Sequence, residues 1–153
     1  MKTTNRSICA MISSTLLITL SGYMPRDAAA ADQQTHAPSA KHKVVFQVSD
    51  DDPKKWVLTF NNVANIQKDL GPENVDIEVV AYGPGLGMLK LDSPVATRIR
   101  NAVESYVKIV ACENTMHAQH LEKQDMLSDV SYVPSGVIEL IKKQEAGYAY
   151  IKP

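Results

Sequence analysis

The sequence predicts an α/β protein, a three-layer α/β/α sandwich around a mainly parallel sheet of about five strands. Short runs rich in β-branched residues recur along residues 43–151. Segments with apolar residues at helical spacing separate these runs. Strands that alternate with amphipathic helices form β-α-β units, which build a parallel sheet with right-handed crossovers and helices on both faces.

The first half of the pattern begins with a strand at residues 43–49, KVVFQVS, whose continuous apolar character is typical of a strand covered on both faces. Residues 50–53, Asp-Asp-Asp-Pro, then supply an N-cap and a first-turn proline for a helix. That helix ends at Gly71-Pro72 and precedes a strand at residues 75–82. Its apolar positions at helical spacing are Trp56, Phe60, Val63, Ala64 and Leu70, of which we expect Trp56 and Phe60 in the core.

The second half continues the alternation after a glycine-rich loop at residues 83–87. A helix begins at Ser93-Pro94, and a strand at residues 107–111 leads to Cys112. Asn114 or Thr115 then caps a short helix that runs to about Gln124. The remaining elements are a short strand at 130–133, a helix introduced by Pro134-Ser135-Gly136 and ended by Gly147, and a last strand at 148–151.

Composition excludes several classes of protein. The formal net charge is -1, whereas a general nucleic-acid-binding protein needs a basic surface. A hydrophobic content of 44% with 22% charged residues is that of a globular chain and not of a disordered one. Two cysteines cannot form a disulfide-dense scaffold.

The N-terminus has the three parts of a secretory signal peptide: Lys2 and Arg6, an apolar run at residues 8–20, and alanines at 28–31. An uncleaved membrane anchor is the alternative, but the run is shorter than the roughly 20 residues that span a bilayer. We expect cleavage after Ala31. The resulting organisation is a signal peptide at 1–31, a flexible lead-in at 32–42 and one domain at 43–153, in a periplasmic or secreted protein without a stable membrane anchor.

Cleavage would leave Cys112 as the single cysteine, and two interpretations of it stand. It directly precedes a helix start, where free N–H groups favour a thiolate. His117 and His120 would add positive charge there, whereas Glu113 would act in the opposite direction. The alternative is a small buried hydrophobe at the end of a strand.

The loop glycines Gly83, Gly85 and Gly87 match neither G-x-G-x-x-G nor a P-loop. They allow a close backbone approach to a ligand or a neighbouring subunit, or they form a plain turn.

Cys112, His117 and His120 also resemble a set of metal ligands, because two histidines three residues apart share a helix face. No fourth ligand is evident and C-x-x-C is absent, so the sequence assigns no metal; two solvated histidines are the alternative. No Ser-His-Asp motif, pair of catalytic carboxylates or cofactor fingerprint supports a hydrolase or an oxidoreductase.

Four segments together resemble the DsrE/DsrF-like family, which includes the TusD-type sulfur-relay subunits. They read VVFQVSDDDPKKW, YGPGLGML, IVACENTM and YVPSGVIELIKKQEAGYAYIKP, and the resemblance covers about residues 43–153. The resemblance implies a small α/β/α domain that assembles into homo- or hetero-oligomers, often trimers or hexamers. It also implies that a cysteine after a central strand carries sulfur as a persulfide, with no cofactor; Cys112 is the matching position.

Three functions are therefore expected in competition. The leading one is an exported protein that binds or transfers sulfane sulfur on Cys112, with a sulfur donor or acceptor protein as its partner. The amides of the following helix, around Asn114 and Thr115, would stabilise the thiolate. The second is a non-enzymatic oligomeric module that binds a small ligand or a metal, with Cys112 structural. The third is a subunit that acts through assembly alone.

Four apolar loop residues are expected either to expose a patch covered by another subunit or to fold onto their own core: Leu86, Met88, Leu89 and Leu91.

Overall fold

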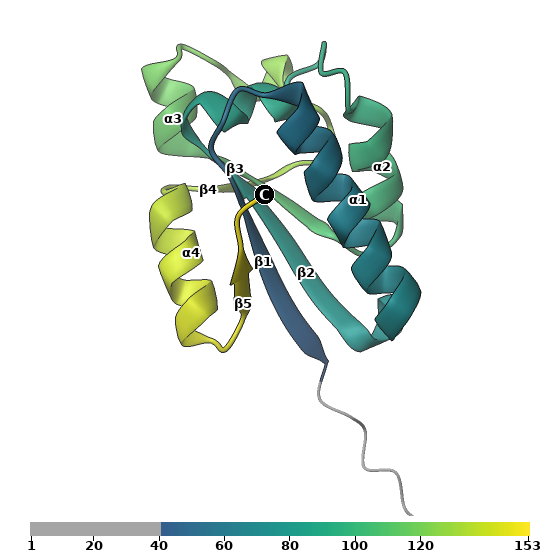
Figure 1. Ribbon diagram of the computed structural model, residues 1–153. Coiled ribbons are helices and arrows are strands. Elements are labelled where there is room, and N and C mark those ends of the chain that lie inside the picture. Colours follow the sequence, from purple (N-terminus) through teal and green to yellow (C-terminus); the bar gives the residue numbers. More distant parts are fainter. Residues whose placement is uncertain (1–40) are drawn as a thin grey trace, which may run out of the picture. The chain divides into compact units, whose positions relative to one another are not determined.

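The computed structural model describes residues 41–153, which form a five-stranded sheet with helices on both faces (Figure 1). The strands are β1 (His42–Val48), β2 (Val75–Ala81), β3 (Lys108–Cys112), β4 (Ser131–Val133) and β5 (Ala149–Ile151). They lie in the order β4-β3-β2-β1-β5, and every neighbouring pair is parallel. The predicted α/β/α sandwich is confirmed.

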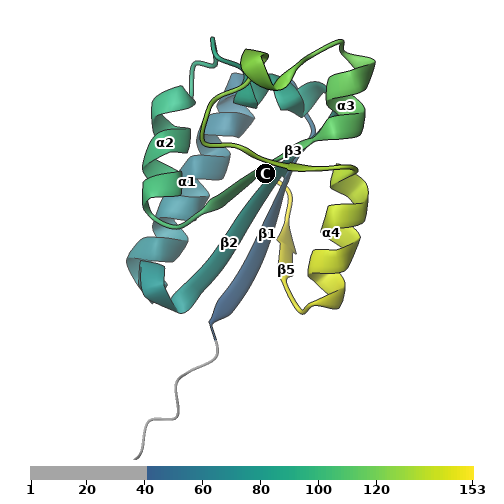
Figure 2. The same ribbon diagram turned by 180° about the vertical axis from the view of Figure 1, so that it is seen from behind.

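The helices divide unequally between the faces. Figures 1 and 2 show α1 (Pro53–Leu70) and α2 (Ala96–Glu104) together on one face and α4 (Gly136–Glu145) on the other. The short helix α3 (Glu113–Ala118) lies at the carboxyl end of the strands. Three 3₁₀ helices complete the described chain: η1 (Pro72–Asn74), η2 (Gly83–Leu89) and η3 (Lys123–Asp125).

The core is correspondingly unequal. The side of the sheet facing α1 and α2 buries a large apolar cluster that includes Phe46, Trp56 and Phe60. Among the described residues, the cluster on the side facing α4 has four buried members, Val45, Val80, Val110 and Leu140, with Tyr82, Val133 and Tyr148 partly buried against them. Trp56 and Phe60 are each 4% exposed, which confirms the prediction that they belong to the core.

The start of α1 follows the predicted capping chemistry. The Asp52 side chain accepts a hydrogen bond of 2.8 Å from the Lys54 N–H, and Pro53 occupies the first turn. At the other end the Gly71 N–H bonds to the Gln67 carbonyl, and Gly71 has φ 86°. A left-handed glycine followed by proline ends the helix, as the sequence indicates.

The helix after Cys112 differs from the prediction at both ends. It begins at Glu113 with Cys112 as the N-cap residue, and it ends at Ala118 instead of continuing to Gln124. His120 has φ 55°, the His120 N–H bonds to the His117 carbonyl, and the Leu121 N–H bonds to the Met116 carbonyl. This pair of bonds ends the helix in a Schellman motif, with histidine at the left-handed position where glycine is usual.

The glycine-rich loop is also more ordered than a plain turn. Its residues continue into η2, where Leu86, Met88 and Leu89 are completely buried. Only Leu91 is exposed, at 62% of its surface. The expected exposed patch is therefore wrong, and the alternative that these side chains fold onto their own core is right.

Gly85 explains why this loop needs glycine. A Cβ atom at this position would lie 2.5 Å from the Val48 carbonyl oxygen at the end of β1. The close approach that Gly85 allows is thus to the chain's own first strand.

The predicted signal peptide and nearly all of the predicted lead-in lie outside the described residues. Of the lead-in, Lys41 and His42 are described, and His42 already belongs to β1. None of the helices within residues 41–153 is both long enough and apolar enough to cross a membrane.

Candidate functional site

The carboxyl ends of the three central strands meet at one edge of the sheet, which brings the loops at 49–52, 83–93 and 112–115 to that edge. The Tyr82 N–H donates to the Val48 carbonyl over 3.1 Å, which joins the ends of β1 and β2. The Gly83 N–H donates to the Thr115 hydroxyl over 3.0 Å, which joins β2 to the start of α3. Cys112 ends β3 at this edge.

Cys112 lies between the starts of two helices and is only 5% exposed. Its Sγ atom is 4.0 Å from the Pro134 carbonyl oxygen, a long contact in which the thiol is the donor. The Asn114 N–H donates to the same carbonyl over 3.1 Å, so the start of α3 is tied to the loop before α4.

Gly136, the first residue of α4, closes the site from the side of the helix. A Cβ atom there would lie 3.0 Å from Tyr82 Cβ and 3.3 Å from Cys112 Cβ. Only glycine lets the start of α4 approach both side chains this closely without displacement.

The surroundings of the thiol favour its ionised form. Burial acts to raise the pKa of Cys112, but the neighbouring donors, which are the Thr115 hydroxyl and the backbone N–H groups of Gly136, Thr115 and Asn114, act to lower it and outweigh burial, so its pKa falls below the ordinary value. The Thr115 oxygen already accepts the Gly83 N–H, which leaves its own proton to donate to the sulfur.

Tyr82 lies beside the thiol, and its phenol stays protonated while the thiol ionises. Burial is the largest cause that raises the pKa of the Tyr82 phenol, with smaller contributions from neighbouring groups that include Tyr150 and Asp50. Tyr82 is therefore uncharged at the pH values at which Cys112 ionises. The site combines one thiol with several hydrogen-bond donors, an arrangement suited to an anionic sulfur.

Residues 42–153 match the DsrE/DsrF-like family, and this match covers almost all of the described chain. The chain belongs to the DsrE/DsrF-like family. No match is found among curated proteins.

Three solved structures resemble this DsrE/DsrF-like protein. The protein of unknown function MTH1491 from Methanobacterium thermoautotrophicum is 37% identical with a TM-score of 0.70, over 74% of this chain and 100% of that one. The conserved protein of unknown function BT1422 from Bacteroides thetaiotaomicron is 16% identical with a TM-score of 0.63, over 76% and 99% of the two chains. The ychN protein from E. coli is 10% identical with a TM-score of 0.60, over 73% and 99%, so these last two show the fold alone.

The predicted loop residues of this DsrE/DsrF-like protein separate into two groups. Gly83 adjoins the thiol site through its bond to Thr115, and it has φ 54°. Gly85 packs against β1, and a Cβ atom at Gly87 would lie 3.4 Å from the Trp56 ring. Gly87 therefore faces α1 and not the thiol.

The two histidines do not form the predicted arrangement. His117 lies in α3, whereas His120 lies beyond its end in the left-handed turn, so they do not share a helix face. Both are exposed, and neither hydrogen bonds to Cys112 among the described residues. Within residues 41–153 no group of three His, Cys, Asp or Glu side chains is placed to hold a metal ion.

Sequence reasoning missed three residues of the site: Tyr82, Pro134 and Gly136. The run Pro134-Ser135-Gly136 was a signal for a helix start, and the structure places that start against the thiol. In a parallel α/β sheet a helix that begins beside a strand's carboxyl end brings its N–H groups to the same edge. That rule, applied to α4, would have indicated Gly136.

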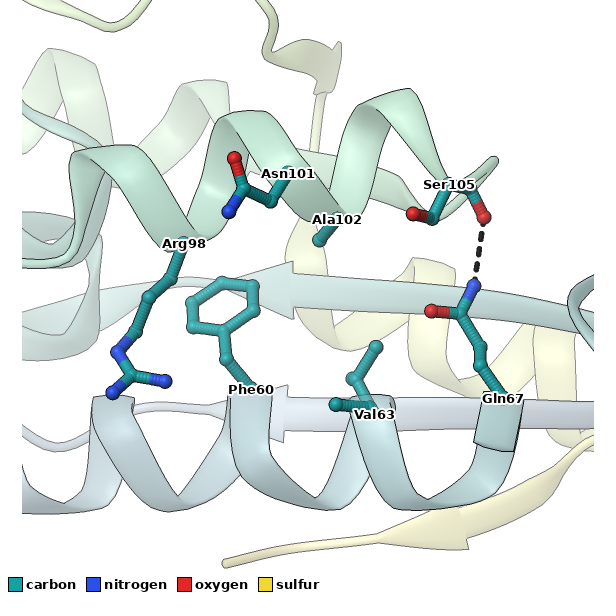
Figure 3. Close-up of a pocket in the computed structure, with 8 residues that line it drawn as sticks. Phe60, Val63, Gln67, Arg98, Asn101, Ala102 and Ser105 are labelled. Carbon is teal, nitrogen blue, oxygen red and sulfur yellow. Dashed lines mark hydrogen bonds between the residues drawn. The ribbon is translucent and has the colours of Figure 1, made fainter. Parts of the chain in front are cut away.

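A separate cavity of about 190 Å³ lies between α1 and α2 (Figure 3). Phe60 and Val63 point from α1 towards Ala102 on α2, and Gln67 closes one end by donating to the Ser105 carbonyl over 2.7 Å. The cavity belongs to the opposite face of the sheet from Cys112 and shares no lining residue with the thiol site.

Proposed function

We propose that this protein is an exported member of its family that binds sulfane sulfur as a persulfide on Cys112 and passes it to a second thiol. The observation that carries this proposal is the position of Cys112 between the starts of α3 and α4, where the Thr115 hydroxyl and the N–H groups of Gly136, Thr115 and Asn114 are the donors that lower its pKa. A purely structural cysteine needs no such donors, whereas a nucleophilic thiolate does. The family resemblance supplies the identity of the cargo.

The transfer step is a thiol–persulfide exchange. The Cys112 thiolate attacks the outer sulfur of a donor persulfide, R–S–SH, and a new S–S bond forms as the S–S bond of the donor breaks. The donor leaves as R–S⁻ and takes a proton from water, while the transferred sulfur keeps its hydrogen. The reverse reaction with an acceptor thiolate releases the sulfur. Electrons balance within the exchange, so the step uses no external oxidant, reductant or cofactor.

Access is the demanding requirement of this proposal. Cys112 is 5% exposed, so a donor reaches its sulfur only when the rim of the site shifts. The rim includes Asn114 and Pro134, which are both exposed, and it therefore lies at the surface. We place the opening at the loop between β4 and α4, because Pro134 and Gly136 cover the sulfur there.

Intact mass spectrometry after incubation with a low-molecular-weight persulfide tests the proposal. The folded protein is expected to gain the mass of one sulfur atom, and the gain is expected to be lost on reduction. Cys112→Ser is the matched control and should gain nothing. A folded wild-type protein that forms no adduct, and whose thiol also resists alkylation, would overturn the proposal.

The burial of Cys112 favours a second function, a non-enzymatic binding module in which this cysteine is structural. A polar cavity of about 310 Å³ offers such a module a place for a small ligand, with Asp51, Lys90 and Gln119 in its lining. Under this alternative Cys112→Ser leaves ligand binding and assembly unchanged. Under the sulfur-transfer proposal the same change abolishes the persulfide.

Self-association and export complete the proposed function. Val137, Ile138 and Ile141 are each at least 45% exposed on the outer face of α4, and a second subunit would cover them. Light scattering is expected to show an oligomer that Ile138→Lys weakens; a monomeric wild type would contradict this.

Export predicts that protein purified from the periplasm or medium begins after Ala31, which the intact mass reports directly.

A further inference from the structure

The face of the sheet under α4 carries three successive pairs of side chains. In the parallel register of β2 and β3, Glu78 pairs with Lys108 and Val80 pairs with Val110. Since side chains alternate between faces, the next pair on this face is Tyr82 with Cys112. Towards the carboxyl ends of the strands, this face therefore carries first a charged pair, then an apolar pair and last the pair that contains the thiol.

Helix α4 presents one matching residue to each pair. Lys143 contacts Glu78, Leu140 packs with Val80 and Val110, and Gly136 abuts Tyr82 and Cys112. The intervals of four and three residues put all three on one side of the helix. The helix thus extends from the charged pair to the thiol as one rigid element, over about 10 Å at 1.5 Å per residue.

The charged end holds a carboxylate that is 1% exposed. The Lys143 ammonium lies 2.6 Å from Glu78 Oε2 and the Lys108 ammonium lies 3.1 Å from the same oxygen. Both contacts are ion pairs, and no group other than these two ammoniums donates a hydrogen bond to either oxygen of Glu78 among residues 41–153. A carboxylate buried in this way is held by its cations alone.

Only one of the two lysines connects Glu78 to α4. The Lys143 side chain is 18% exposed, lies 3.8 Å from Glu139 and rests over the Tyr148 ring at 4.8 Å. Lys108 is on β3 and its side chain is 49% exposed. Because the described cluster beneath α4 has only four buried apolar side chains, with Tyr82, Val133 and Tyr148 partly buried against them, the Glu78–Lys143 pair is a major attachment of this helix to the sheet.

We propose that Glu78 is a positioning residue for Cys112: through Lys143 it fixes α4 on the sheet and so holds the Gly136 N–H at the sulfur. This inference rests on the proposed function for its biological meaning. It adds that the chain controls its thiol from the opposite end of a helix. The same attachment sets how readily the start of α4 moves away to admit a donor.

Matched lysine variants test the inference, with the pH titration of the thiolate's ultraviolet absorbance as readout and Cys112→Ser as the blank. This readout does not require access to the sulfur or any persulfide. Lys143→Met is expected to lower the thiolate fraction at neutral pH severalfold. Lys108→Met, which removes an equal charge from the same carboxylate without touching α4, is expected to leave it unchanged.

The direction in which Glu78→Gln changes the thiolate fraction separates positioning of α4 from a direct electrostatic effect on the sulfur. Loss of a negative charge would by itself increase the thiolate fraction, whereas loosening of α4 decreases it. We expect a decrease, with circular dichroism confirming a folded chain. An increase, or equal effects of the two lysine variants, would overturn the inference. If Glu78→Gln does not fold, the lysine pair decides alone.

The two proposals fail separately. A protein that accepts no sulfur but titrates as described refutes transfer and retains the positioning role. A protein that accepts sulfur with a titration insensitive to Lys143 retains transfer and refutes positioning.

Discussion

Gly136 approaches Cys112 so closely that a Cβ atom on Gly136 would lie 3.3 Å from the Cys112 Cβ atom. This contact joins the first residue of α4 to the last residue of β3. The proximity brings the Gly136 N–H within reach of the sulfur, which it helps to ionise. A residue with no side chain is therefore a chemical member of the site.

Gly136→Ala is expected to push the start of α4 away from Tyr82 and Cys112, since the added methyl would lie 3.0–3.3 Å from them. Overpacking of this kind costs about 1–3 kcal/mol of unfolding free energy. The variant should also raise the pKa of the Cys112 thiol, because the Gly136 N–H moves off the sulfur. Urea denaturation and the pH profile of alkylation measure the two effects. Ser135→Ala is the control, because the Ser135 side chain makes no capping hydrogen bond; equal effects of both variants would contradict the role of Gly136.

Thr115→Val is expected to raise the pKa of Cys112, because it removes the hydroxyl that donates to the sulfur. It also leaves the Gly83 N–H without its acceptor, at a cost of about 1–3 kcal/mol if that group stays buried. Alkylation rates across pH report the first effect and denaturant midpoints the second. Thr115→Ser keeps the hydroxyl, so its alkylation pH profile and its denaturant midpoint should both match those of the wild type. A Val variant whose pH profile matches the wild type would refute this account of the thiol.

The double variant His117→Ala, His120→Ala is expected to leave the thiolate fraction and the metal content unchanged. Both side chains are exposed, they come from different local structures, and among the described residues neither hydrogen bonds to Cys112. Native mass spectrometry of the purified protein and thiol titration measure the outcome. Loss of a stoichiometric metal, or a shifted titration, would restore the ligand or tuning roles that the sequence suggested.

The architecture could be predicted because its signals are local. The β-branched strands, the cap at Asp52-Pro53 and the stop at Gly71 each act within a few residues, and all are found where expected. The end of α3 was missed because His120, and not glycine, takes the left-handed conformation. The loop after β2 was missed because burial of its leucines decides its 3₁₀ conformation.

The site was predicted in part for the same reason. Cys112 could be identified, since a strand's carboxyl end is visible in the sequence. Its neighbours Tyr82 and Gly136 are brought to it by the register of the sheet and the crossover to α4, which no local pattern encodes. The strand VDIEVVAY carries two acidic residues, Asp76 and Glu78, and the sequence does not show which of them forms ion pairs; the partner Lys143 is identified only by the packing of α4.

The stability of the protein should depend on pH through Cys112. Burial acts to raise the pKa of this thiol, but the Thr115 hydroxyl and the surrounding N–H groups bring its pKa in the folded state below the ordinary value. Between the two values the unfolded chain binds the proton and the folded chain does not, so the free energy of unfolding rises with pH. The contribution is complete above the unfolded-state pKa of about 8.5 and is lost as the pH falls through the folded-state value.

Comparison of the wild type with Cys112→Ala isolates this contribution, because other titrating groups cancel at each pH. The difference in unfolding free energy is expected to be larger at about pH 9 than at about pH 6. The cavity left by the missing sulfur destabilises the variant equally at both values and does not affect the comparison. In a Thr115→Val background, this difference in unfolding free energy should change less between the two pH values, because the substitution removes a donor that lowers the pKa of the thiol. A difference that is constant, or that shrinks as the pH rises, would show that the folded protein does not favour the thiolate.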